Sequence, residues 1–145
     1  MSGRFPVYAA PAEHFGWLCS RTGYVPTPMF QAIEAMDSKG EIRGMVGYDS
    51  FTPNSVQMSI AVDSMIAVRA LAVPAFDYAF NQLGKSLSIG IVSSRNGEAL
   101  TLNAWLGYQE TYRIRDAHSD GIDLVILELR RADCRWLKKD VRHAG

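Results

Sequence analysis

A short capped helix between two apolar strands is the feature that most constrains this chain. The segment reads SSRNGEALTLNAWLGY over residues 93–108. Ala99, Leu102 and Leu106 recur at helical spacing, which predicts a short amphipathic helix over residues 98–106. A helix this short does not fold alone, so its apolar face must pack against neighbouring elements.

Residues suited to start and to stop this helix flank it on both sides. Three polar residues that can accept hydrogen bonds from its first N–H groups precede it: Ser93, Ser94 and Asn96. Gly107 follows it and suits a left-handed C-cap, because glycine takes positive φ without strain. Apolar alternation over residues 86–92 and 108–115 predicts a strand on each side. The unit is therefore strand, capped helix, glycine stop and strand.

The composition indicates one globular domain over residues 1–145. Apolar residues make up 48% of the chain and charged residues 21%, which suits a chain with a buried core. The formal net charge is zero, which argues against a nucleic-acid partner. We expect no membrane helix and no signal peptide, because long apolar runs are missing from the sequence. Cys19 and Cys134 lack CxxC spacing and are expected to be reduced thiols in a cytoplasmic protein.

The remaining pattern alternates strands with two further helices. Strands are expected near residues 5–9, 30–36, 41–48, 55–62 and 122–129, and a helix near residues 12–21. The second helix carries Pro74, which lacks an N–H group and is expected in a first turn, so this helix should start near Ala70 and end at Gly84. Gly44 and Gly47 lie in mid-strand, where glycine indicates close packing or a bulge rather than a phosphate loop.

The C-terminal segment, residues 130–145, is basic. Between residues 130 and 142 it holds six basic and two acidic residues, interspersed with Cys134, Trp136 and Leu137. One interpretation is a solvated helix with a single apolar edge. The other is a contact surface for a homodimer or for an anionic partner.

The central unit resembles the second half of the GNAT fold, that of the Gcn5-related N-acetyltransferases. The family signature there is an asparagine, an alanine three residues later, a leucine six residues later, and then leucine-glycine-aromatic. The matching residues in this chain are Asn96, Ala99, Leu102, Leu106, Gly107 and Tyr108. The resemblance covers about residues 30–129. It implies an α/β (α+β) domain of the acyl-CoA N-acyltransferase fold, with a mixed, mostly antiparallel, twisted sheet flanked by helices. More loosely, the chain is similar to small GNAT-like proteins of tailed phages and prophages.

The resemblance implies acetyl transfer from acetyl-CoA to a primary amine by direct attack. The pyrophosphate of the cofactor needs N–H groups at a helix N-terminus. The family usually has the pattern Arg/Gln-x-x-Gly-x-Gly/Ala at this helix start, whereas residues 64–71 of this chain read SMIAVRAL. The resemblance therefore assigns pyrophosphate binding to Ala67, Val68, Arg69 and Ala70. The thioester carbonyl needs donors where negative charge develops, and the resemblance places them around Ala61 and Val62. Asn96 would contact the pantetheine arm, or it serves as a helix cap.

The catalytic residues are the weakest part of the resemblance. Many relatives have a tyrosine acid seven residues after the asparagine, but that position is Asn103, which cannot donate a proton as an acid. Gln57 and Ser59 stand where a glutamate base is often found, and neither is a base near neutral pH. The acceptor, a small-molecule or peptide amine, would be bound by residues 12–21, 24–30 and 116–121. No metal site is expected, because the histidines lack partners at metal-ligand spacing.

The sequence is therefore compatible with two functions. The first is an acetyl-CoA-dependent N-acetyltransferase. The second is a catalytically degenerate GNAT-fold protein that binds CoA or acts in assembly and interaction, which the missing tyrosine at Asn103 and the missing glycines at Ala67 and Ala70 favour.

Overall fold

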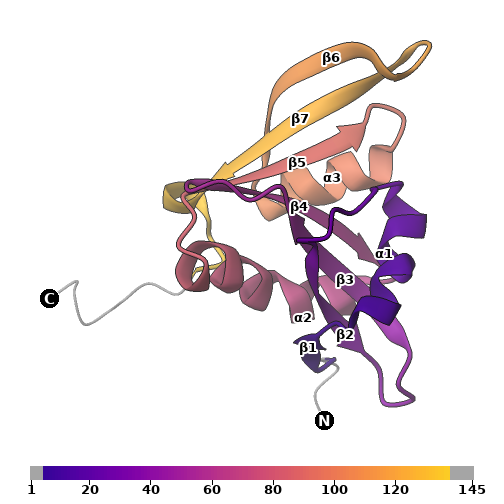
Figure 1. The fold of residues 1–145 in the computed structure, drawn as a ribbon, viewed down its shortest axis with the longest axis vertical. Coiled ribbons are helices and arrows are strands. Elements are labelled where there is room, and N and C mark those ends of the chain that lie inside the picture. Colours follow the sequence, from indigo (N-terminus) through magenta and orange to yellow (C-terminus); the bar gives the residue numbers. More distant parts are fainter. Residues whose placement is uncertain (1–4, 138–145) are drawn as a thin grey trace, which may run out of the picture.

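A seven-stranded sheet in the order β1-β2-β3-β4-β5-β7-β6 organises the computed structural model, which describes residues 5–137 (Figure 1). The strands are β1 (Val7–Ala9), β2 (Gln31–Met36), β3 (Ile42–Asp49), β4 (Ser55–Val62), β5 (Leu87–Ser93), β6 (Gln109–Ser119) and β7 (Ile122–Arg130). Strands β4 and β5 pair in parallel, and the other neighbours pair antiparallel. The expected mixed, mostly antiparallel sheet is confirmed.

Helices cover both faces of this sheet. A 3₁₀ turn, η1 (Ala12–His14), leads into α1 (Phe15–Thr22) on one face. On the other face lie α2 (Met65–Phe76), its π-helical continuation η2 (Asp77–Gln82) and α3 (Gly97–Leu106). Figure 1 shows α1 and α2 on opposite sides of β3 and β4. The apolar side chains accordingly form two clusters, a small one under α1 and a large one under α2 and α3.

The two mid-strand glycines let helices approach the sheet. A Cβ atom on Gly47 would lie 2.4 Å from Cζ of Phe30 and 2.7 Å from Cδ2 of Leu18. A Cβ atom on Gly44 would lie 2.8 Å from Cδ1 of Leu71, on the opposite face. Since these distances are shorter than any real carbon contact, close packing is the reason for both glycines, as predicted.

Helix α2 begins earlier than the sequence predicted. Its N-cap is Ser64, whose Oγ accepts a hydrogen bond from the N–H of Ala67 at 3.4 Å. The start near Ala70 was therefore wrong, and Pro74 lies inside the helix. Because α2 buries a continuous apolar face, packing outweighs the one hydrogen bond that the proline removes. Gly84 ends the helical segment with φ +69°, as expected.

The C-terminal segment is not a solvated helix where the structure describes it. A single 3₁₀ turn, η3 (Arg131–Asp133), is followed by irregular chain up to residue 137. Cys134 is buried, and Trp136 and Leu137 pack against the large core cluster. Apolar contact with the core thus fixes this stretch. Residues 138–142 of the predicted basic tail lie outside the described residues.

Two further expectations concern the cysteines and the membrane. Cys19 and Cys134 are both free thiols, and burial raises the pKa of each. Within residues 5–137, no helix is both long enough and apolar enough to cross a bilayer.

Candidate functional site

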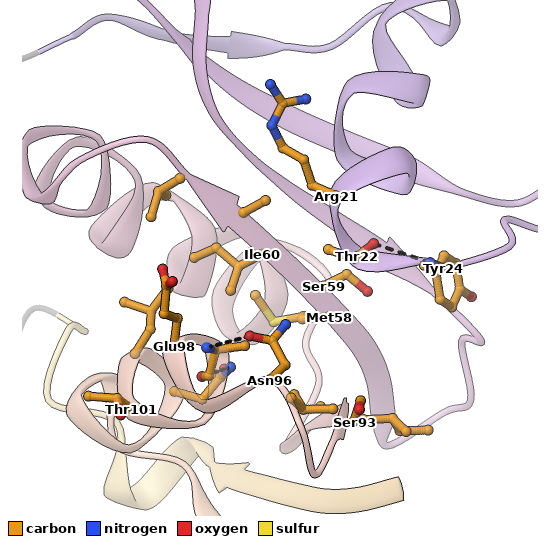
Figure 2. Close-up of a pocket in the computed structure, with 18 of the residues that line it drawn as sticks. Arg21, Thr22, Tyr24, Met58, Ser59, Ile60, Ser93, Asn96, Glu98 and Thr101 are labelled. Carbon is orange, nitrogen blue, oxygen red and sulfur yellow. Dashed lines mark hydrogen bonds between the residues drawn. The ribbon is translucent and has the colours of Figure 1, made fainter. Parts of the chain in front are cut away.

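The separation of β4 and β5 opens a large cleft. These parallel strands pair over Ser55–Gln57 and Leu87–Ile89. Beyond that point β4 continues along β3 and β5 continues along β7, so the two strands separate. A cleft of about 1200 Å³ lies in the gap, lined by β4, β5, the start of α2, α3 and the end of α1 (Figure 2).

The sheet register decides which backbone groups of β4 face this cleft. The N–H of Asp63 donates to the carbonyl of Arg43 at 2.9 Å, so the backbone of Asp63 points toward β3. Directions alternate along a strand, and Ala61 therefore also points toward β3. Ile60 and Val62 direct their N–H groups into the cleft instead. The prediction for Val62 is consistent with this geometry, whereas the N–H of Ala61 is turned away from the cleft.

The N-terminus of α2 opens into the same cleft. Asp63 and Ser64 connect β4 to α2, and Met65, the first helical residue, lines the cleft. Ser64 already accepts from the N–H groups of Ala67 and Val68, at 3.4 Å and 3.2 Å. The N–H groups of Met65 and Ile66 have no acceptor within the helix and are the orphan donors of its first turn.

The structure thus moves the expected phosphate site toward the start of α2. Of the four residues assigned to it, Val68 lines the cleft. Ala67 and Ala70 are buried in the core, and Arg69 lies on the exposed face of the helix. These three do not line the cleft, because α2 begins before them and places them within its body. The signal that could have located the site is Ser64, a good N-cap directly before the apolar stripe.

Helix α3 forms the opposite wall. Asn96 is its N-cap, with Oδ1 accepting from the N–H of Ala99 at 3.1 Å, and Gly107 ends it in the left-handed conformation. Asn103 is nearly buried, and its Nδ2 donates to the carbonyl of Ala99 at 2.8 Å. Both asparagines line the cleft. The role of Asn96 as a cap is confirmed, and its contact with pantetheine stays a prediction.

The end of α1 and the loop after it border the cleft on the other face of the sheet. Arg21, Thr22 and Tyr24 line the cleft there, together with Gln57 and Ser59 of β4. Figure 2 shows Ser59 facing the end of α1, where Thr22 and Tyr24 lie. The two predicted catalytic residues of β4 are thus brought beside the predicted acceptor side.

A buried carboxylate holds this acceptor side in place. The side chain of Asp49 accepts hydrogen bonds from Tyr24 Oη at 2.7 Å, from Thr27 Oγ1 at 2.6 Å and from the N–H of Thr27 at 2.9 Å. The N–H of Ser50 donates to it as well, at 3.0 Å. Burial opposes ionisation of Asp49, but these hydrogen bonds outweigh burial and lower its pKa. This bracing role of Asp49 was not anticipated from the sequence.

Two tyrosines near the cleft keep their protons. Burial, together with the hydrogen bond to Asp49, raises the pKa of Tyr24 to about 12. Tyr108 is buried, with its hydroxyl 2.6 Å from Ser88 Oγ, and burial raises its pKa strongly. His118, at the end of β6, also lines the cleft. Among residues 5–137, no cluster of three metal-binding side chains occurs.

Similarity to known proteins is confined to three-dimensional structure. No protein-family model matches the sequence, and no curated protein matches it significantly. Spermidine/spermine N-acetyltransferase SpeG from Vibrio cholerae, in complex with manganese ions, superposes with a TM-score of 0.70 at 13% identity, covering 89% of this chain and 94% of that chain. The chain has the GNAT fold. A point mutant of SpeG gives a TM-score of 0.73 at 13% identity, covering 90% and 96% of the two chains. A dodecameric SpeG in an intermediate state gives 0.69 at 12% identity, with 90% and 96% covered.

The fold implied by the sequence signature is thereby confirmed. The cleft opens between β4 and β5, the two strands of the GNAT fold that separate in this chain. At such low sequence identity, the structural similarity shows the fold but does not identify the substrate. The looser resemblance to phage and prophage proteins stays a prediction.

Proposed function

We propose that this GNAT-fold chain is an acetyl-CoA-dependent N-acetyltransferase that acts on a primary amine. The observation that carries the proposal is the parting of β4 and β5, which directs the N–H groups of Ile60 and Val62 into a cleft that also receives the N-terminus of α2. N–H groups fixed by a sheet suit a thioester oxygen on which negative charge develops. The free N–H groups of Met65 and Ile66 suit a pyrophosphate.

The donor set and the size of the cleft fit acetyl-CoA. A volume of about 1200 Å³ accommodates an extended cofactor arm, and Met58, Ile60 and Leu102 give part of the lining an apolar character. Two lining carboxylates, Asp63 and Glu98, oppose a polyanion. Asp63 is partly compensated, since Arg43 Nε lies 3.4 Å from its Oδ2.

The chain's own side chains suggest how the acceptor is handled. The amine nitrogen attacks the carbonyl carbon, the carbon–sulfur bond breaks, and the amine loses a proton while the leaving thiolate gains one. We assign Gln57 and Ser59 to orienting the amine by hydrogen bonds, because neither can remove its proton. His118, through ordered water, is the candidate that accepts it. Asn103 donates one amide hydrogen to Ala99, and its second can stabilise the thiolate without protonating it.

The second candidate is a catalytically degenerate protein that keeps the fold and binds CoA. The amide at position 103 favours it, since Asn103 replaces the general acid that many relatives have there. Both candidates bind CoA, so turnover separates them.

A binding test and a turnover test together decide between these functions. Thermal unfolding with acetyl-CoA at a hundred times its dissociation constant should show about 2.7 kcal/mol of stabilisation. Met65→Glu places a negative charge at the free N–H groups, at a position where glutamate suits a helix start, and should abolish this shift. Val73→Glu is the matched control, because Val73 is exposed on the same helix and does not line the cleft.

Turnover is then measured as thiol release over a panel of amines that includes polyamines, aminoglycosides and peptides. Release above the rate of hydrolysis supports the acetyltransferase. Binding without release on any amine supports the degenerate protein. A parent chain without a thermal shift at millimolar acetyl-CoA contradicts both.

A further inference from the structure

An arginine packs over a pair of contacting indole rings at the C-terminal end of α3, Trp105 and Trp136, whose ring centroids lie 5.3 Å apart. The guanidinium carbon of Arg135 lies 4.1 Å from the ring centroid of Trp136 and 4.8 Å from that of Trp105. Its Nη2 donates to the carbonyl of Trp105 at 2.5 Å, and Trp136 Nε1 donates to the carbonyl of Leu106 at 2.8 Å. Cation–π contact with the two rings and the hydrogen bond to Trp105 together restrain the position of the guanidinium.

The charge of this guanidinium is not balanced by a carboxylate of the described residues. Arg43, Arg113 and Arg130 each pair with an acidic side chain. Within residues 5–137, Arg135 has no such ion pair, and its hydrogen bond goes to a neutral carbonyl. A fixed guanidinium with remaining N–H donors is suited to bind a phosphate through two parallel hydrogen bonds.

The cluster of Arg135, Trp105 and Trp136 adjoins the wall of the candidate cofactor cleft. Glu98, Thr101, Leu102 and Trp105 share the face of α3 that lines the cleft. Trp105 is 41% exposed, so one part of its ring meets the cleft while Arg135 packs against it. At 1.5 Å per residue, roughly 10 Å of helix separates Trp105 from Glu98. The wall therefore begins with the acidic Glu98 and ends at Trp105, which Arg135 contacts from outside the cleft lining.

Coenzyme A presents a complementary sequence of groups. Its thioester arm would lie where β4 and β5 part, and its pyrophosphate at the first turn of α2. A further phosphate, a dianionic monoester, is attached to the ribose at the nucleotide end. Resting on the proposed function, we propose that Arg135, held by Trp105 and Trp136, binds this 3′-phosphate and makes the site selective for CoA over its dephosphorylated form. The exposed surface of Trp105 then borders the nucleotide.

Calorimetric titration with CoA and with 3′-dephospho-CoA tests this assignment. The parent chain should bind CoA about tenfold more tightly, as a charge-assisted bidentate contact predicts. Arg135→Ala should lose this preference while its affinity for dephospho-CoA stays unchanged. Arg135→Lys should retain part of it, because lysine keeps the charge and loses the planar fork. Lys39→Ala, in the exposed β2–β3 turn, removes one positive charge elsewhere and should change neither affinity.

Each outcome bears on a distinct claim. A parent chain that binds CoA and dephospho-CoA equally overturns the role of Arg135 and leaves the proposed function intact. This comparison uses the parent chain alone, so it does not depend on whether a variant folds. An Arg135→Ala variant that keeps the tenfold preference overturns it as well. A parent chain that binds neither ligand contradicts the proposed function itself. Quenching of tryptophan fluorescence by CoA, reduced in Trp105→Phe, is expected alongside the affinity change.

Discussion

The proposed acceptor side and the proposed cofactor side of the cleft differ in how their polar groups are used. On the acceptor side, the carboxylate of Asp49 is buried and satisfied by hydrogen bonds from Tyr24, Thr27 and Ser50. On the cofactor side, the N–H groups of Ile60 and Val62 point into the cleft, past the point where β5 pairs with β4.

This difference separates two kinds of polar group. A buried group whose hydrogen bonds are made within the protein stabilises the fold, and removing it lowers stability. A group that the fold leaves open toward a cleft contributes little to stability and is available to a ligand. Substitutions on the two sides should therefore affect stability on one side and binding on the other.

The largest expected effect is at Asp49. Asp49→Ala removes the buried carboxylate that accepts charge-assisted hydrogen bonds from Tyr24 and Thr27, and should lower the free energy of unfolding by about 3 kcal/mol and the melting temperature by roughly 10 °C. Asp120→Ala, in the exposed β6–β7 turn, is the control and should change stability by less than about 0.5 kcal/mol. Chemical unfolding measures both. Equal stabilities of the two variants would show that the acceptor loop does not depend on this carboxylate.

A pair of proline substitutions on β4 tests the comparison most directly. Ala61→Pro removes an N–H that points toward β3 and should cost roughly 2 kcal/mol of stability. Val62→Pro removes an N–H that points into the cleft, so it should cost less than about 1 kcal/mol of stability but reduce acetyl-CoA affinity. Thermal unfolding with and without ligand measures both quantities. The reverse pattern would mean that the assigned backbone directions are wrong.

The contribution of Asp49 should also depend on pH. Its pKa in the folded protein is lowered from the ordinary 3.8, so the unfolded chain binds the proton more readily. Its stabilising effect is then fully present above about pH 4 and is lost as the pH falls through the folded pKa. The difference in unfolding free energy between the parent and Asp49→Asn should shrink between pH 7 and pH 3 in urea titrations. A difference that is constant with pH would argue against an ionised Asp49.

The smallest effect is expected at Tyr24. Tyr24→Phe removes one hydrogen bond to Asp49 and should cost about 1 kcal/mol, measured by chemical unfolding. Since the pKa of Tyr24 is raised to about 12, its phenol should stay protonated in a spectrophotometric titration up to pH 11. A Tyr24→Phe variant whose titration curve loses a group near pH 10 would contradict that shift.

Local sequence patterns predicted much of the fold, because helical spacing, capping and glycine conformation depend on residues that are close in the chain. The spacing in α3, its Asn96 cap and its Gly107 stop all appear as expected, and so does the close packing at Gly44 and Gly47. The strand at residues 55–62 was predicted with the bounds that β4 has. Pro74 misled the prediction, because a local rule placed it in a first turn while burial of a whole helix face decided the start of α2.

The candidate site was predicted in part. Gln57, Ser59, Val62, Val68, Asn96 and Asn103 all line the cleft. Ala61 was assigned a donor that the structure turns toward β3, and Ala67, Arg69 and Ala70 lie within the body of α2. These errors have one origin, since the direction of an N–H group follows from strand register and helix start.

The sequence by itself determined the order of elements, the capped helix with its glycine stop and the GNAT-type signature, because spacing, capping and glycine conformations act between near neighbours. Tertiary structure alone decided where β4 and β5 part, which amides face the cleft, how Asp49 braces Tyr24 and Thr27, and how Arg135 meets Trp105. Those contacts join residues far apart in the chain, and their free energy depends on burial and geometry that exist once the sheet has formed.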